Sequence, residues 1–285
     1  MAANRWRIGD VTVSRVVEIE AVGGLGRFLP AATRDAVLEI PWLQPHFANE
    51  EGRLKASIHA LIIETPDARI VVDTCIGNDK QRGVPAWHMM QTAFLDDFAA
   101  AGFAPDAIDA VLCTHLHVDH VGWNTRLVDG RWVPTFPNAR YLMGADEFRF
   151  WEGRGDDPNF GPVFSDSVKP VFDAGLVDLV ATDHQVAPGV TLVPTPGHTP
   201  GHVSVLIASK GEEAFITGDI LHHPCQLAHP EWGAIVDEDP GRAERTRRDI
   251  FERFSETPTL VIGTHFAAPT AGRLVRDGDA YRLDV

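Results

Sequence analysis

Cysteine, basic residues and long apolar runs are all scarce in this sequence. Its three cysteines, Cys75, Cys113 and Cys225, lie far apart and form no C-x-x-C pair, which argues against a disulfide framework and a cysteine-based zinc site. The 25 lysines and arginines face 40 aspartates and glutamates, and the net charge of −15 disfavours binding to nucleic acid or to an anionic membrane surface. We therefore expect a small molecule as the partner.

No stretch approaches the ~20 consecutive apolar residues that a membrane-spanning helix needs. The first residues, "MAANRWRIGDVTVSRV", also lack the apolar run of a secretory leader. These absences predict a cytoplasmic protein with no membrane partner. The hydrophobic content of 44% and the charged content of 23% are ordinary for a globular protein.

Short β-rich runs recur along the chain and alternate with helical segments. The runs lie at residues 11–20, 57–64, 69–73, 110–114, 139–143, 190–195, 203–208, 213–218 and 259–264, before a hairpin at 272–283. Apolar spacing predicts helices at 88–102 and 239–256, the second with Asp239 as N-cap and Pro240 at its first position. Strands interleaved with helices predict an α/β layered fold.

Two stretches rich in glycine and proline, 22–47 and 152–166, resist regular assignment. Long loops of this kind are either lids and binding loops or loosely packed connectors. We expect a single domain over residues 1–285, with an N-terminal extension or lid at about 22–50 and a helical insertion at about 145–176.

The segment "CTHLHVDHVGW" concentrates metal-binding side chains directly after an apolar run. It holds His115, His117, Asp119 and His120 within six residues. The C-terminal end of a strand is where α/β sheets commonly place their sites. Four side chains so close along the chain cannot easily surround one ion tetrahedrally, so the segment suits two adjacent metal ions better than one.

Three further strand ends carry the same ligand chemistry: His198 in "TPGHTPGH", Asp219 in "ITGD" and His265 in "IGTH". Any one such residue is more often an ordinary surface or core residue. Together with the first segment they supply five histidines and two aspartates, about what a two-metal site with one bridging carboxylate needs.

In this order and spacing, "THLHVDH", "TPGHTPGH", "TGD" and "GTH" resemble the metallo-β-lactamase fold superfamily, and the resemblance covers most of the chain. It implies an αββα sandwich with a dinuclear site along one sheet edge. It also implies that His115, His117 and His198 hold the first ion, that Asp119, His120 and His265 hold the second, and that Asp219 bridges them. Two supporting residues follow from the same pattern: Asp73, which would orient a ligand histidine or its loop, and His202.

Departures from the superfamily's pattern narrow the choice among its branches. The commonest zinc β-lactamases use a cysteine ligand near Asp219, but Cys225 comes six residues too late, and the nuclease branch carries large inserted domains that this chain lacks. Leu116 and Trp123 resemble the branch of acyl-homoserine lactonases and organophosphate (methyl parathion) hydrolases. Glyoxalase II-like thioesterases, which usually have a histidine or asparagine at Leu116, and persulfide dioxygenases remain alternatives.

The resemblance thus implies a dinuclear-metal hydrolase in which a metal-bridging hydroxide cleaves a lactone or related ester, or a phosphotriester. Asp119 is the expected general acid and base. The lactonases carry a tyrosine three residues after the bridging aspartate, where this chain has His222, and its two tyrosines are Tyr141 and Tyr281. His222 is therefore the second candidate catalytic residue, with an ordinary loop histidine as the alternative reading.

The metal ions and the substrate pocket complete the expectations. Imidazole and carboxylate ligands accept zinc, our first choice, but also manganese, iron or cobalt, and a mononuclear-iron oxidoreductase is an alternative of another class. Aromatic residues in or near the irregular segments suggest a pocket for an apolar or aromatic ester or lactone; the candidates are Phe28, Trp42, Phe47 and Trp87. The N-terminal extension would cap the site within one subunit or pack on a second copy in a homodimer.

Overall fold

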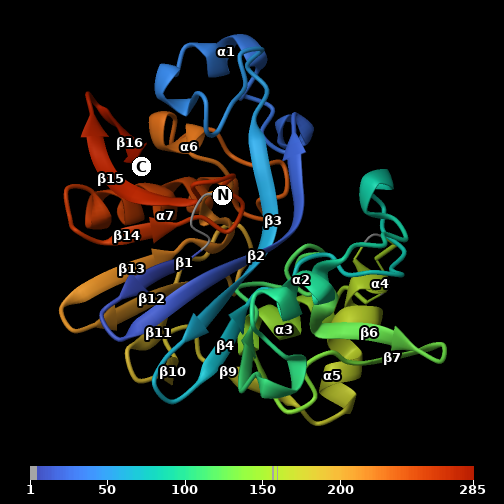
Figure 1. Cartoon of the computed structure of the whole chain (residues 1–285). Helices are drawn as coiled ribbons and strands as arrows, with labels where there is room; N and C mark the ends of the chain where they lie inside the picture. Colours follow the sequence, from blue (N-terminus) through green and yellow to red (C-terminus); the bar gives the residue numbers. More distant parts are fainter. Residues whose placement is uncertain (1–4, 156, 159) are drawn as a thin grey trace.

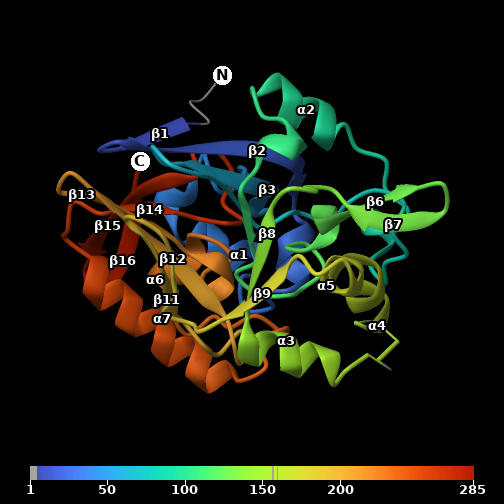
Figure 2. The ribbon, with the colours of Figure 1, turned by 90° about the horizontal axis from the view of Figure 1, so that it is seen from below.

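The structure is a computed structural model that describes residues 5–155, 157–158 and 160–285. Two large β-sheets pack face to face, and helices cover their outer faces (Figures 1 and 2). The α/β class and the αββα sandwich are confirmed.

The first sheet has seven strands in the order β1-β2-β3-β4-β5-β8-β9. Their bounds are β1 (Arg5–Ile8), β2 (Val11–Val22), β3 (Lys55–Glu64), β4 (Arg69–Val72), β5 (Ala110–Leu112), β8 (Arg140–Gly144) and β9 (Val177–Val180). Pairing is antiparallel from β1 to β4 and parallel from β4 to β9. The carboxyl ends of β4, β5 and β8 therefore meet at one edge of the sheet.

The second sheet has seven strands that follow one another in sequence order. They are β10 (Gln185–Ala187), β11 (Val190–Pro194), β12 (Val203–Ser209), β13 (Glu212–Ile216), β14 (Leu260–Ile262), β15 (Ala271–Asp277) and β16 (Ala280–Asp284). Only β13 and β14 pair in parallel, so their carboxyl ends lie side by side. The closing hairpin pairs Asp277 with Ala280 around Gly278, whose φ of 62° suits the tight turn predicted there.

Alternating side chains of both sheets form the core between them. Val13, Leu61 and Val72 of the first sheet lie in one buried cluster with Val205 and Ile216 of the second. Successive side chains of a strand point to opposite faces, so the residues in between face the helices. Burial of this apolar surface holds the two sheets together.

The α-helices lie outside the two sheets. These are α1 (Arg34–Leu38), α2 (Phe94–Ala100), α3 (Ala145–Glu152), α4 (Gly161–Val163), α5 (Lys169–Asp173), α6 (Cys225–Ala228) and α7 (Pro240–Phe254). Figure 2 shows α7 along the outer side of the second sheet and α2 on the opposite side of the molecule, over β2. A separate hairpin, β6 (Thr125–Val128) and β7 (Arg131–Pro134), projects beside the first sheet (Figure 1).

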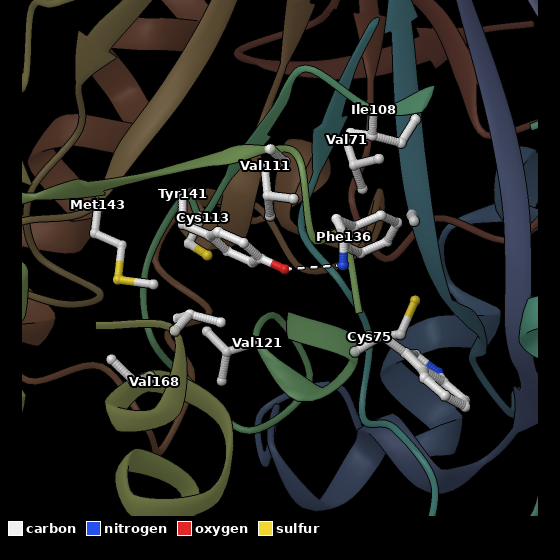
Figure 3. Close-up of a cluster of buried hydrophobic side chains, with 14 of the residues drawn as sticks. Val71, Cys75, Ile108, Val111, Cys113, Val121, Phe136, Tyr141, Met143 and Val168 are labelled. Carbon is white, nitrogen blue, oxygen red and sulfur yellow. Dashed lines mark hydrogen bonds between the residues drawn. The ribbon is translucent and has the colours of Figure 1, made fainter. Parts of the chain in front are cut away.

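A buried cluster on the outer face of the first sheet contains Tyr141 (Figure 3). Its hydroxyl accepts a hydrogen bond from the Phe136 N–H at 3.1 Å and donates one to the Asn124 carbonyl at 3.1 Å. Tyr281 lies on β16, where its hydroxyl contacts Glu252 at 3.0 Å. Both tyrosines therefore have structural roles away from the strand ends that carry the metal-binding residues.

The helix predicted at 239–256 is confirmed as α7, with the Asp239 side chain accepting a hydrogen bond from the Arg242 N–H at 2.9 Å. The helix predicted at 88–102 is wrong in its first half, because α2 spans only Phe94–Ala100. The preceding backbone is bonded elsewhere: Met89 N–H to the Lys80 carbonyl, and Asp79 N–H to the Met90 carbonyl. These cross-links hold the segment as a loop.

The stretch at 22–47 contains short elements: the 3₁₀ turn η1 (Gly24–Arg27), α1 and the 3₁₀ turn η2 (Pro41–Leu43). Another 3₁₀ turn, η3 (Pro85–Trp87), lies in the loop after β4. Between α3 and α5, the stretch at 152–166 includes α4 and the start of a π-helical turn, η6 (Phe164–Val168). Among the described residues, no helix is both long and apolar enough to cross a membrane.

Candidate active site

Seven histidine and aspartate side chains converge from four loops that follow strands. His115, His117, Asp119 and His120 follow β5; the others are His198 after β11, Asp219 in the 3₁₀ turn η7 (Gly218–Ile220) after β13, and His265 after β14. All are buried except Asp119, which is half-buried. Strands of both sheets thus contribute to one site at a common edge.

The first group consists of His115, His117 and His198. His117 Nδ1 lies 3.0 Å from His115 Nε2 and 2.9 Å from His198 Nε2. Burial lowers the pKa of all three rings well below the usual histidine value, so the rings are neutral. Neutral imidazole nitrogens that face one another at this distance are arranged as ligands of a cation.

The second group consists of Asp119, His120 and His265. The two histidine Nε2 atoms lie 3.2 Å apart, and they lie 3.7 Å (His120) and 3.6 Å (His265) from the carboxylate oxygens of Asp119. Burial acts to lower the pKa of His120 and His265, but the nearby carboxylates, above all Asp219, raise both. The carboxylates around this second group therefore outweigh the effect of burial on its two histidines.

Asp219 lies between the groups. Its Oδ2 is 3.6 Å from His198 Nε2 and 3.3 Å from His120 Nε2, and its Oδ1 is 3.1 Å from His265 Nε2. Burial acts to raise the pKa of Asp219, but His265, His120 and His222 hold it well below the ordinary value. Oδ1 has no hydrogen-bond partner among the described residues, although the side chain is buried. An ionised, buried and unsatisfied carboxylate between two histidine groups fits a ligand shared by two cations.

Asp73 orients His120 of the second group. It follows β4 at a φ of 56°, and its Oδ2 accepts a hydrogen bond from His120 Nδ1 at 2.9 Å. Its two oxygens also accept from the backbone N–H and the hydroxyl of Thr114, both at 2.8 Å. The carboxylate therefore turns His120 Nε2 toward the site and ties down the start of the ligand loop.

His202 supports Asp219 through the backbone. Its Nε2 accepts a hydrogen bond from the Asp219 N–H at 2.8 Å, and its Nδ1 donates to the Thr195 carbonyl at 3.0 Å. Burial lowers the pKa of His202 to about 4, which keeps the ring neutral and able to accept this bond. His202 thus fixes η7 rather than joining the ligand groups.

Two buried carboxylates of the site were not found from the sequence. Asp237 accepts a hydrogen bond from His198 Nδ1 at 2.8 Å. Glu147 on α3 accepts from the Leu116 N–H at 3.1 Å and the Gly201 N–H at 3.0 Å, which links two ligand loops. Asp237 lies in a loop that does not directly follow a strand, so the sequence held no signal for it. Glu147 lies shortly after the end of β8, as His115 does after β5, so its place after a strand was a signal that could have found it.

His222 lies beside the ligands. Its Nε2 is 3.3 Å from Asp219 Oδ2, and neither ring nitrogen has a hydrogen-bond partner among the described residues, although the residue is 4% exposed. Its backbone N–H is held by the Gln226 side chain at 2.8 Å. Because its backbone is held in place and both ring nitrogens lack partners among the described residues, His222 can form a hydrogen bond to a molecule that enters the site.

A cavity of about 800 Å³ opens above the ligands. His117, Asp119, Asp219, His222 and His265 form its polar floor. Its walls are mostly apolar and include Ile19, Leu25, Phe28, Ile58, Val84, Trp87, Phe160 and Val236. Within the wall, the rings of Phe28 and Trp87 stack on each other, with centroids 6.1 Å apart and an interplanar angle of 6°.

Two of the four aromatic residues expected in the pocket lie elsewhere. Phe47 is 1% exposed in the core beneath the second sheet, where its ring meets that of Phe266 at 6.1 Å. Trp42 packs against the same core cluster. Both residues belong to the part of the N-terminal extension that packs against the second sheet. They are therefore not part of the cavity wall.

Comparison with known proteins agrees with this geometry. Residues 55–265 match the sequence profile of the metallo-beta-lactamase superfamily. A probable metallo-hydrolase of Mycobacterium tuberculosis is 28% identical over 189 residues, which are 58% of this chain and 57% of that protein. The chain thus spans little more than half the length of this curated relative.

Two solved structures share the fold. The hydrolase AbOPH, of the beta lactamase superfamily, superposes with a TM-score of 0.81 at 24% identity, over 100% of this chain and 98% of that chain. AidC, a dizinc quorum-quenching lactonase solved with its product, gives 0.75 at 19% identity, over 98% and 95% of the two chains.

Proposed function

The chain belongs to the metallo-beta-lactamase superfamily, and we propose that it is a metal-dependent hydrolase that uses two divalent cations to cleave a lactone or a related ester. The observation that carries the proposal is the position of Asp219 between two complete ligand groups, on the floor of a cavity with apolar walls.

His115, His117 and His198 would hold one cation, Asp119, His120 and His265 the other, and Asp219 both. Two bound cations supply Lewis acidity, which lowers the pKa of water and polarises the group under attack. Zinc is the proposed metal, because imidazole and carboxylate ligands suit it and because AidC is a dizinc enzyme.

The protein's own residues then move protons and orient the substrate. Asp119 lines the cavity and is half-buried, so its carboxylate can take the proton of the attacking water and pass it to the leaving alkoxide. His222, with both ring nitrogens free of partners among the described residues, donates a hydrogen bond to the oxygen of the scissile group. This role takes the place of the tyrosine of the lactonases.

The walls indicate the kind of substrate. Phe28, Trp87 and Val84 offer apolar surface above the polar floor, which suits an acyl chain or an aryl leaving group. The likeness to the lactonase AidC supports an acyl lactone as the first substrate class, and phosphotriesters are the second class to test.

The first test is proton release in a pH-stat with a medium-chain acyl lactone, before and after exhaustive chelation. We expect acid production that stops on chelation and returns when zinc is added back. A metal-replete protein that releases no protons would refute lactone hydrolysis, and the same assay with aryl esters, phosphotriesters and thioesters would then separate the remaining ester classes. Oxygen consumption by the iron-loaded protein would instead support the oxidoreductase alternative.

A further inference from the structure

Asp237 makes a contact to the site that the proposed function does not use. Its side chain is fully buried, and its Oδ1 accepts a hydrogen bond from His198 Nδ1 at 2.8 Å. The other oxygen, Oδ2, accepts from the Ala234 N–H at 3.0 Å, so both oxygens are engaged. Because a carboxylate only accepts here, the proton of the His198 ring must lie on Nδ1, and Nε2 is left with its lone pair facing His117.

The backbone around Asp237 holds His198 as well. The Glu238 N–H donates to the His198 carbonyl at 2.9 Å, and the Asp239 N–H donates to the Gly197 carbonyl at 2.9 Å. Asp239 is also the N-cap of α7, a helix of 15 residues. The His198 loop is therefore fastened to the start of a long helix and not only to its own strand.

The residues just before Asp237 contact the cavity. The Ile235 N–H donates to the Phe28 carbonyl at 2.9 Å, and Val236 lines the wall. Further back, the Trp232 carbonyl accepts from the Gln226 side chain at 2.7 Å, and the oxygen of that same side chain holds the His222 N–H. We call residues 232–238 the brace segment.

We propose that Asp237 is a positioning residue for His198, and that the brace segment sets His198, His222 and the Phe28 wall relative to one another. The inference rests on the proposed function only in taking His198 as a metal ligand. Carboxylates that fix the tautomer and direction of a ligand histidine typically contribute about 10–100-fold in metal affinity.

The test compares Asp237→Asn and Asp237→Ala with the wild type. Each protein is loaded with zinc, and metal loss is followed during dialysis against a chelator. The Asn side chain keeps one oxygen that accepts from Nδ1, but it loses the charge that strengthens the bond and the second oxygen, which accepts from the Ala234 N–H. We expect metal loss about 10-fold faster for Asp237→Asn and about 100-fold faster for Asp237→Ala.

Four further measurements make the result specific. Glu231→Gln removes one exposed carboxylate nearby and should lose metal at the wild-type rate. The ligand-field absorption of the cobalt(II)-loaded protein should change in both Asp237 variants, and thermal unfolding without metal should show that they fold. Val236→Ala keeps the backbone of the brace segment and shortens one side chain of the wall. It should raise KM for any substrate that the protein hydrolyses, while metal loss stays unchanged.

Metal loss from both Asp237 variants within about two-fold of the wild type would overturn the proposal, since a positioning carboxylate contributes about 10-fold or more. Equal losses from the Asn and Ala variants would also overturn it, because the charge and not the bond to Nδ1 would then matter. If Asp237→Ala does not fold, the Asn variant decides alone. Metal loss is measured without any substrate, so a failed search for a lactone or ester leaves this result intact.

Discussion

The floor and the wall of the cavity are built in different ways. The proposed metal ligands at the floor and beneath it follow strands, and buried carboxylates hold some of them, as Asp73 holds His120 and Asp237 holds His198. Strand residues such as Ile58 of β3 form part of the wall, but its aromatic part comes from two loops, where Phe28, just after η1, stacks on Trp87 of η3. The floor is fixed by the sheets, whereas the aromatic part of the wall depends on how these two loops pack against the finished fold.

This difference suggests that changes on the floor should affect metal content and turnover, whereas changes in the wall should affect substrate affinity.

The largest effect is expected for Asp219→Ala. Removal of the carboxylate between the two groups should lose metal and activity together, with turnover falling by more than about 100-fold, since even supporting residues contribute 10–100-fold. Metal content after dialysis and turnover should be measured in the same sample. Asp249→Ala, on the exposed face of α7, is the control. A fully loaded Asp219→Ala protein would show that this carboxylate is not a shared ligand.

His222→Ala should separate the effect of the floor on metal content from its effect on turnover. Metal content should remain at the wild-type level, while turnover should fall by about 100-fold, as for removal of a hydrogen-bond donor to the reacting oxygen. His222→Tyr would test whether a phenol can do the same work. Unchanged turnover in the Ala variant would remove His222 from the mechanism.

Asp73→Asn should lower metal affinity less than the change at Asp219 does, and turnover less than the changes at Asp219 and His222 do. Asparagine tolerates the φ of 56° at this position and can still accept from His120, but without charge. We expect metal affinity and turnover to fall by about 10-fold. Titration with zinc in the presence of a competing chelator measures the first, and an affinity equal to that of the wild type would contradict the orienting role.

Substitutions in the wall should change KM and little else. Trp87→Ala removes a ring that lines the cavity and could contact the substrate. One aromatic contact is worth about 0.5–1.5 kcal/mol, so KM for an acyl or aryl substrate should rise by about 2–10-fold. Metal content and kcat should change little. The matched variant Trp42→Ala, which lies outside the wall, should leave KM unchanged. A larger change in Trp42→Ala than in Trp87→Ala would reverse the assignment of the wall.

The smallest effect on catalysis is expected for substitution of Lys80, which lies in the same loop as Trp87. Lys80 is buried, donates to Thr125 at 2.8 Å and lies 3.8 Å over the ring of Trp132. Burial lowers the pKa of Lys80 from 10.5 to about 7. Between these values the unfolded chain holds the proton and the folded chain does not, so this group makes stability rise with pH.

Lys80→Met should remove that rise. Urea unfolding between pH 7.5 and 9.5, a window of about two units inside the shift, measures the free energy of unfolding at each pH. Lys169→Met, at an exposed residue paired with Asp173, should keep the wild-type slope. An identical slope in the Lys80 variant would show that this lysine stays charged in the folded protein.

Local pattern predicted β2–β5, β8 and β11–β16, because the two-residue period and the β-branched composition reflect burial directly. It missed the short strands β1, β6, β7, β9 and β10. It failed over 88–93, where Met90 matched the helical spacing of Phe94 and Phe98 but its carbonyl is bonded to Asp79. Backbone bonds to a distant segment outweigh local spacing, and such bonds leave no trace in a window of neighbouring residues.

The sequence by itself determined the layered fold and the set of side chains brought together on the floor. It did so because ligands that follow buried strands are carried to the sheet edge wherever the strands pair. Only the tertiary structure decided that Asp237 holds His198, that Glu147 links two ligand loops, and that Phe28 and Trp87 form the wall while Trp42 and Phe47 join the core. These contacts join residues far apart in the chain through irregular loops, whose course depends on packing against the completed sheets.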